Sequence, residues 1–505
     1  MDNIFQNKSA ESLGQRIKNG TFWAFIGHGL LQVLSLTAII VLARLLSPDD
    51  FGVVAIAMVV WGMVRLFGDI GIGAKIIQQS DEVDQYANAA FWLNILIASC
   101  LFLFTAAIAP FAASFYKNDL VNPILMILGL GFFLNSFGAT HSVLLIKEME
   151  FKKKALVDVT VELITKIMTI LMAFVGYGVW SLVIPQVLSS PFRVLALWKI
   201  CPWRPSVEFN FIYWKKIYHY GKYILGTDLL RYISLNGDYM VIGRFLGVFE
   251  LGLYRFAHMI ANYPVENIVW VVGKVCFPAF SKLQNDLARL RETFLKMIKL
   301  LSLVSFPLFI GLVGVAHELI PFVFGEKWNN AIIPLQIIVG FTLIRSFVSP
   351  SGIIVRALGR PRIEFIFNLA QVPIVLLAII VGVQFGIIGV AIAVSSVVGI
   401  MALWFLKLSV GLVDLRLKDV FRQLYPALLS SLVMLGVVLL VRHGLMGWGY
   451  WDYQILLVCI PSGAVVYFAT LLMVFRSSFQ MLWNIFMEVI GNRVTDLKKV
   501  YPAFR

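Results

Sequence analysis

Hydrophobic runs of about twenty residues, separated by short polar connections, recur along the whole chain of 505 residues. A run of this length with few charges is what a helix needs to cross the hydrocarbon core of a bilayer. The pattern therefore predicts an all-α polytopic membrane protein with fourteen transmembrane helices. The predicted spans are 21–45, 52–74, 87–113, 121–145, 155–176, 178–199, 222–246, 250–276, 297–316, 331–356, 364–383, 386–408, 424–442 and 454–475.

The span 250–276 departs from this apolar pattern. Its polar residues recur at helical spacing: Arg255, His258, Asn262, Glu266 and Lys274. In a helix they form one stripe. Each ionisable group costs about 2.5–3.5 kcal/mol at a bilayer centre, so we expect the stripe to face a water-filled cavity. In the alternative reading, the two end residues reach the membrane surfaces and the other three form a packing network.

Composition and charge agree with a membrane protein. Of the residues, 60% are hydrophobic and 14% are charged, against about 25% charged in a soluble domain. The first twenty residues lack the apolar core of a cleavable signal peptide, so we expect the first hydrophobic segment to stay. The cysteines are scattered without a CxxC pair, which predicts neither disulfides nor a metal site: Cys100, Cys201, Cys276 and Cys459. No cofactor is expected.

The basic residues sort by side of the membrane. With the N-terminus inside, about 30 of the 42 Lys and Arg residues fall on the cytoplasmic side and about five on the other. This asymmetry predicts that both termini are cytoplasmic. It also assigns the net charge of +14 to the membrane rather than to nucleic acid.

The charged residues inside the predicted spans are the main candidates for functional residues. The basic ones are Arg65, Lys166, Arg193, Arg231, Arg255, Lys274 and Arg345, and the acidic ones are Asp69, Asp158, Glu162, Asp228, Asp238 and Glu266. Pairs one helical turn apart, such as Glu162–Lys166 and Asp228–Arg231, can neutralise each other, which is the structural alternative for them. Arg345 has no acidic residue within a turn of sequence, so it is the strongest single candidate for function.

An internal repeat relates two parts of the chain that lie about 200 residues apart. LARLLSPDDFGVVAI at 42–56 matches IGRFLGVFELGLYRF at 242–256, aligning Gly52 with Gly252. Each copy holds six predicted helices, so the copies share an orientation and form two parallel six-helix bundles. The predicted domains are 1–210, 211–411, and 412–505 for helices 13 and 14 with the tail.

Sequence motifs for catalysis are absent. There is no P-loop, HExxH, nucleophile elbow or Cys–His cluster, so an enzyme is not expected. Parallel repeats with inward polar stripes are typical of a transporter.

The chain resembles the polysaccharide transporters of the multidrug/oligosaccharidyl-lipid/polysaccharide exporter superfamily, most closely its colanic acid exporter branch of lipid-linked oligosaccharide flippases. The segments that carry the resemblance are ARLLSPDDFG (43–52), DIGIGAKIIQ (69–78), YMVIGRFLG (239–247), FPAFSKLQNDLARLR (277–291) and PFVFGEKWNNAIIPLQ (321–336). The resemblance implies two six-helix bundles plus a terminal pair. It further implies movement of an undecaprenyl-diphosphate-linked oligosaccharide across the bacterial inner membrane by alternating access, for capsule, exopolysaccharide or O-antigen synthesis, with the pathway's polymerase as a possible partner.

The resulting hypothesis divides the candidate residues into two roles. Substrate binding is assigned to Arg65, Arg231, Arg255, Asn262 and Arg345, because Arg presents a planar donor fork to phosphate oxygens. Proton coupling is assigned to Asp69, Asp238, His258 and Glu266. Two other classes stay open: a cation-coupled multidrug antiporter of the same superfamily, and a lipid scramblase or structural partner of a glycan-assembly complex.

Overall fold

The computed structural model describes residues 13–68, 71–78, 81–207, 211–284, 286–484 and 487. Within these residues the chain consists of helices joined by short connections, with no strand, and each predicted span falls on one or two helices. The backbone contacts divide the chain into two compact units, Met1–Arg255 and Phe256–Arg505. Each unit is described by itself below.

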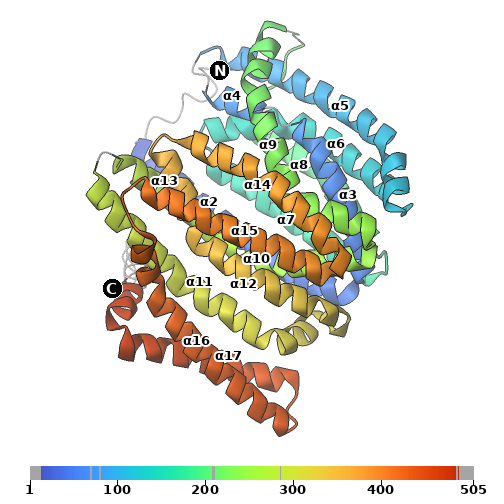
Figure 1. Ribbon diagram of the computed structural model, residues 1–505. Coiled ribbons are helices and arrows are strands. Elements are labelled where there is room, and N and C mark those ends of the chain that lie inside the picture. Colours follow the sequence, from blue (N-terminus) through green and yellow to red (C-terminus); the bar gives the residue numbers. More distant parts are fainter. Residues whose placement is uncertain are drawn as a thin grey trace, which may run out of the picture. The chain divides into compact units, whose positions relative to one another are not determined.

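The first unit is a bundle of long helices in which neighbours along the chain often pack side by side (Figure 1). Its helices are α2 (Leu13–Leu45), α3 (Pro48–Leu66), α4 (Ile72–Gln78), α5 (Val83–Tyr116), α6 (Val121–Lys147), α7 (Phe151–Phe174), α8 (Trp180–Ile200), α9 (Phe211–Phe245) and the first turns of α10 (Val248–Lys282). Helix α6 packs against both α5 and α8, and α7 lies between α8 and α2. These packings place α6, α7 and α8 around a common interior.

The second unit is built around α11. Its elements are the rest of α10, α11 (Leu287–Phe324), η1 (Glu326–Ala331), α12 (Ile332–Val348), α13 (Pro350–Ala357), α14 (Pro361–Gly382), η2 (Val383–Phe385), α15 (Gly386–Gly411), α16 (Leu417–Gly447) and α17 (Asp452–Val474). Helix α11 packs against α12 on one side and against α16 and α17 on another. The last two helices form an adjacent pair (Figure 1).

Nine segments of the described residues are long and apolar enough to cross a membrane. Two of them contain two α-helices each: Glu326–Ala357 contains α12 and α13, and Arg362–Gly411 contains α14 and α15. Helices α3, α7, α9 and α10 do not appear among the nine, and each of the four carries charged residues in its interior or at its ends. The multi-pass membrane character is thus confirmed, and the number fourteen stays a prediction.

Several predicted spans have different boundaries in the structure. The span 52–74 is divided, because α3 ends at Leu66 and α4 begins at Ile72. The span 331–356 is divided between α12 and α13 at Pro350, which has no N–H to continue the helical hydrogen bonding. Helix α11 begins ten residues before its predicted span 297–316, because Asp286 caps it by accepting a hydrogen bond from the backbone N–H of Arg289 at 3.1 Å. Hydropathy alone does not register such polar first turns.

The sequence SPDD determines where α3 begins. Ser47 is the N-cap, Pro48 occupies the first helical position, and the Asp50 side chain completes a capping box. The Ser47 hydroxyl donates to Asp50 at 2.7 Å, and the backbone N–H of Asp50 donates back to that hydroxyl at 3.2 Å. The helix start is therefore specified locally.

The starts of α3 and α10 cross each other through two glycines. A Cβ atom at Gly52 would lie 2.0 Å from the carbonyl oxygen of Val248, and one at Gly252 would lie 1.9 Å from that of Pro48. Positions 48 and 52 correspond to 248 and 252 in the sequence repeat. The contact is thus reciprocal, and only glycine permits so close an approach of two backbones.

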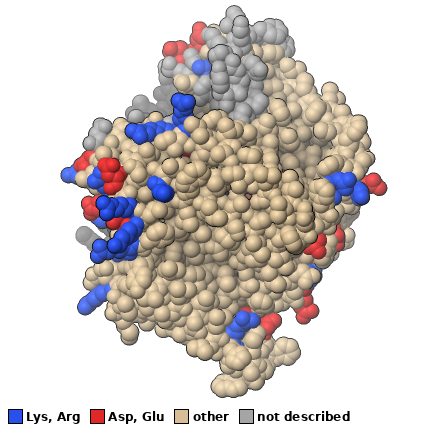
Figure 2. Space-filling view, in the orientation of Figure 1, with Lys and Arg blue, Asp and Glu red and all other residues tan. Residues whose placement is uncertain are grey.

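Charged side chains of the second unit collect where its helices are connected. Arg291 of α11 donates to Asp414, in the connection between α15 and α16, at 2.6 Å. Arg356 donates to both oxygens of Glu364 across the α13–α14 connection, at 2.8 and 3.0 Å. Figure 2 shows Lys and Arg side chains lying close to Asp and Glu side chains at the left of the view.

Candidate functional site

A polar cavity of about 660 Å³ lies inside the first unit. Its walls come from α3, α6, α7 and α8, with Leu42 from α2. This volume lies in the range of small-molecule binding sites, about 300–1,000 Å³. A hydrophilic cavity inside a bundle with apolar outer surfaces is therefore the first candidate site.

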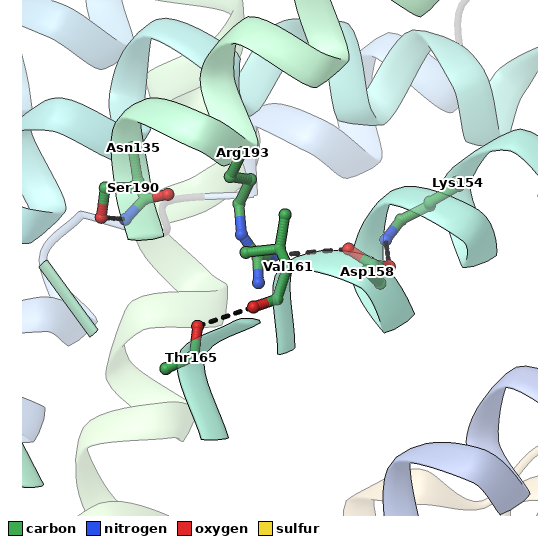
Figure 3. Close-up of polar contacts among 7 residues, drawn as sticks. All are labelled: Asn135, Lys154, Asp158, Val161, Thr165, Ser190 and Arg193. Atoms are coloured by element: carbon green, nitrogen blue, oxygen red, sulfur yellow. Dashed lines mark hydrogen bonds and ion pairs between the residues drawn. The ribbon is translucent and has the colours of Figure 1, made fainter. Parts of the chain in front are cut away.

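Helix α7 contributes the charges of this cavity. Asp158, Glu162 and Lys166 recur every four residues, so they form one face of the helix, and all three line the cavity. Lys166 lies 3.1 Å from Glu162. Asp158 accepts from Lys154 at 2.5 Å and from Arg193 of α8 at 3.3 Å (Figure 3). The local neutralisation expected for Glu162–Lys166 is thus present, on a face that opens to the cavity.

Helices α6 and α8 supply uncharged polar groups. Asn135 donates to the Ser190 hydroxyl at 2.6 Å (Figure 3) and to the carbonyl of Gly131 at 2.8 Å. A Cβ at Gly131 would lie 2.9 Å from the side chain of Val187, so this glycine lets the two helices approach. Asn135 and Ser190 are not among the residues predicted from sequence, because their pairing joins residues 55 positions apart.

Helix α3 brings one predicted substrate residue to the cavity. Arg65, in the last turn of α3, is exposed and lines the cavity together with Trp61. Trp61 packs edge-on against Phe132, with ring centroids 5.6 Å apart. Asp69, predicted for proton coupling, lies outside the described residues.

Three more predicted residues lie on α9 and the start of α10. Asp238 is 5% exposed and accepts from the Tyr254 hydroxyl at 2.9 Å. Arg255 has its guanidinium carbon 5.8 Å from the ring centre of Tyr239, a cation–π contact. Arg231 of α9 is exposed. Asp238 and Arg255 are thus linked through a Tyr239–Tyr254 edge-on pair at 5.9 Å.

The second unit joins three predicted residues in one hydrogen-bonded group. Asn262 donates to the backbone carbonyl of His258 at 2.9 Å, and its amide nitrogen is 3.1 Å from a ring nitrogen of that histidine. Arg345 of α12 donates to the Asn262 side-chain oxygen at 3.2 Å. Glu266, one turn further along α10, is exposed. Arg345 and Asn262 were both predicted to bind substrate, but their contact was not predicted.

Two tryptophan side chains hold the connection after α8 and the start of α9 against α5. Trp92 donates to the carbonyl of Ser206 at 2.8 Å, and Trp214 donates to that of Ala89 at 2.9 Å. Burial raises the pKa of the Cys201 thiol at the start of this connection. A protonated, buried thiol is a poor metal ligand. The described residues contain no group of three or more His, Cys, Asp or Glu side chains suited to hold a metal ion.

The family model for polysaccharide biosynthesis proteins matches residues 41–333 of the chain. The chain belongs to this family. The match covers α3 to α11 and therefore includes the cavity of the first unit, His258 and Asn262, while Arg345 lies beyond its end.

Proteins similar to this family member have names that refer to teichuronic acid, lipopolysaccharide and succinoglycan biosynthesis. The teichuronic acid biosynthesis protein TuaB of Bacillus subtilis is 27% identical over 86% of the chain and 91% of its own length. The lipopolysaccharide biosynthesis protein WzxC of Escherichia coli is 27% identical over 75% of the chain and 78% of its own length. The succinoglycan biosynthesis transport protein ExoT of Rhizobium meliloti is 25% identical over 61% and 63%.

Solved structures share the fold at low sequence identity. The lipid II flippase MurJ, in an inward closed conformation, superposes with a TM-score of 0.75 over 90% of the chain and 99% of its own, at 17% identity. An inward-facing multidrug transporter of the MATE family superposes with a TM-score of 0.59 over 76% of the chain and 94% of its own, at 15% identity. At these identities the likeness concerns the fold alone.

Proposed function

We propose that the chain is a flippase that moves an undecaprenyl-diphosphate-linked oligosaccharide from the cytoplasmic to the outer leaflet of the bacterial inner membrane by alternating access. The observation that carries the proposal is membership in the polysaccharide biosynthesis family. The names of the relatives, one of which is a transport protein, and the fold shared with a lipid II flippase support it. No catalytic step is assigned to the chain.

The proposal includes the finer topology. Fourteen helices cross the membrane, both termini are cytoplasmic, and the domains are 1–210, 211–411 and 412–505. The separation of basic residues between the two sides supports this arrangement. The pathway's polymerase is the proposed partner, because the transported repeat unit is the building block of a polymer.

Within this function, arginines bind the substrate. Arg65 faces the polar cavity, while Arg255 and Arg345 present guanidinium groups beside Tyr239 and Asn262. A guanidinium forms bidentate hydrogen bonds with phosphate, which suits the diphosphate link. Arg231, being exposed, is assigned to the same role.

Proton coupling is assigned to the carboxylates and the histidine. Asp238 is buried and Glu266 is exposed, and His258 contacts Asn262. Asp69 completes this proposed set. These groups change charge on binding a proton, which is the property that coupling requires.

The test is surface polysaccharide in a deletion strain complemented with the wild type, Arg345→Ala or Arg356→Ala. We expect Arg345→Ala to lower polymer about tenfold, the size of one lost charged hydrogen bond. The control arginine, Arg356, is paired with Glu364 at a helix connection, and its loss should leave polymer unchanged. Normal polymer at normal protein level from Arg345→Ala would remove Arg345 from the binding role.

The second candidate is a cation-coupled multidrug antiporter, favoured by the fold shared with the MATE transporter. Proteoliposomes containing the wild type distinguish the two functions. Cation-driven dye efflux, together with failure of the wild type to restore polymer, would replace the flippase proposal with this one.

A further inference from the structure

Two carboxylates of α7 line the same cavity but have different surroundings. Asp158 accepts from two cations, Lys154 and Arg193, one on each oxygen. Glu162 forms its ion pair with Lys166, whose Nζ lies 3.1 Å from Oε1. Its side chain is 30% exposed. The carboxylate is therefore partly open to a ligand inside the cavity.

The depth of the Glu162–Lys166 pair in α7 argues against a purely structural role. Glu162 is at the middle of a helix of 24 residues, about 18 Å from either end at 1.5 Å per residue. Ionisable groups at that depth of a membrane helix are rare and usually line a path or site. Here both members of the pair face the cavity rather than another helix.

The walls near Glu162 are rich in hydrogen-bond acceptors. Asn135 donates its two amide N–H groups to the Gly131 carbonyl at 2.8 Å and the Ser190 hydroxyl at 2.6 Å, and Gln186 donates one to the Leu182 carbonyl at 2.7 Å. Thr165 and Thr169 donate their hydroxyl hydrogens to the carbonyls one turn earlier, at 2.7 and 2.8 Å. What these uncharged side chains leave toward the cavity is mainly oxygen lone pairs. Such a wall suits a ligand with many O–H donors.

The charges of the cavity argue against a highly anionic ligand. Of its three basic residues, Lys166 and Arg193 already have carboxylate partners, Glu162 and Asp158. Arg65 is the one that forms no ion pair with a described residue. The formal balance of the lining is three positive and two negative charges, a single net charge. An uncharged sugar ring fits this balance better than a chain of uronates.

We propose that Glu162 and Lys166 bind the hydroxyl groups of an uncharged pyranose unit in the transported glycan. Glu162 accepts a hydroxyl hydrogen through Oε2, and Lys166 donates an N–H to a neighbouring hydroxyl oxygen while keeping its contact with Glu162. The inference rests on the proposed flippase function and adds a specificity-determining contact to it.

The test compares charge removal with charge exchange in the complemented deletion strain. E162Q should lower surface polymer about tenfold or more, because a charged hydrogen bond to the sugar is lost. E162K/K166E keeps an ion pair but reverses donor and acceptor, so we expect polymer to stay low. Normal polymer from E162Q, or polymer restored by the exchange, would overturn the proposal in favour of a structural pair.

A third variant guards against misfolding of the exchanged protein. E162Q/K166Q removes both charges together, so neither is left without its partner. We expect normal protein level and low polymer, and normal polymer would overturn the proposal. The matched control is Glu292–Lys296 of α11, an exposed pair with the same spacing at 2.6 Å, whose exchange should leave polymer normal.

Sugar chemistry is tested with purified full-length protein and two free sugars at equal concentration. Glucose should raise the melting temperature of the wild type more than that of E162Q, because a bound ligand stabilises the folded state. Glucuronate should not show this difference. Equal glucose shifts in the two proteins, or a larger difference with glucuronate, would overturn the assignment. If the wild type restores no polymer, the flippase proposal is wrong. If E162Q gives normal polymer, only the proposed contact between Glu162 and the sugar is wrong.

Discussion

Glu318 and Arg442 form an ion pair between α11 and α16 of the second unit. Glu318 is 1% exposed, and its Oε1 lies 2.5 Å from the Arg442 guanidinium. Its other oxygen has no hydrogen-bond partner among the described residues. A carboxylate so placed depends on its one cation, because an ion pair that loses a member leaves a buried charge without compensation.

Removing that cation should therefore destabilise the protein strongly. We expect Arg442→Ala to lower the free energy of unfolding by about 3–5 kcal/mol and to lower the melting temperature in detergent. Arg356→Ala, which breaks the more exposed pair with Glu364, should change it by about 1 kcal/mol or less. Equal melting temperatures of the two variants would contradict this account.

Residue contacts were predictable from sequence only within one helix. The contact of Asn262 with His258 follows from spacing of four, as does Glu162 with Lys166. Arg345 was singled out because it lacks a nearby acid, yet its hydrogen bond to Asn262 spans 83 positions and needed the fold. Glu318 was missed because the predicted span 297–316 ended before it, while α11 continues to Phe324.

At the scale of elements, hydrophobic length was a good guide to where helices lie. Each predicted span falls on a helix because a membrane helix must satisfy its backbone internally, so apolar length and helix coincide. Caps and prolines, which hydropathy ignores, account for the differences at Asp286 and Pro350. The close crossing of α3 and α10 was visible only as two aligned glycines in the repeat.

The crossing predicts a specific sensitivity of these two helices. Gly52→Ala and Gly252→Ala would each place a Cβ within about 2 Å of a backbone oxygen, so the helix starts must separate. We expect each to lower the melting temperature and the polymer level. Gly436→Ala in α16 is the control, because nothing lies within 4 Å of its new Cβ and Ala favours a helix by about 1 kcal/mol. Unchanged stability at Gly52→Ala would show that the contact is easily relaxed.

At the scale of the whole molecule, the proposed topology states on which side of the membrane each connection between helices lies. Lys117 follows α5 and lies on the proposed outer side, whereas Lys152 begins α7 on the proposed cytoplasmic side; both are exposed. The positive-inside rule gives the direction, since basic residues are retained on the cytoplasmic side.

Labelling with a membrane-impermeant maleimide tests this arrangement. In a cysteine-free background, Lys117→Cys should be labelled in intact spheroplasts, and Lys152→Cys only after the membrane is opened. The two sites share the same helix bundle, so each is the other's control. The reverse pattern would invert the topology, and labelling of both in intact spheroplasts would break the assignment of α5 to α7.

The reciprocal glycine contact has a consequence for how mutations act on it. Position 52 approaches residue 248 as position 252 approaches residue 48, which is the self-complementary pattern of an interface between two identical subunits. Between two identical subunits, one glycine codon would supply both contacts. In this single chain the two contacts depend on two codons that mutate independently, so loss of one glycine is not mirrored at the other.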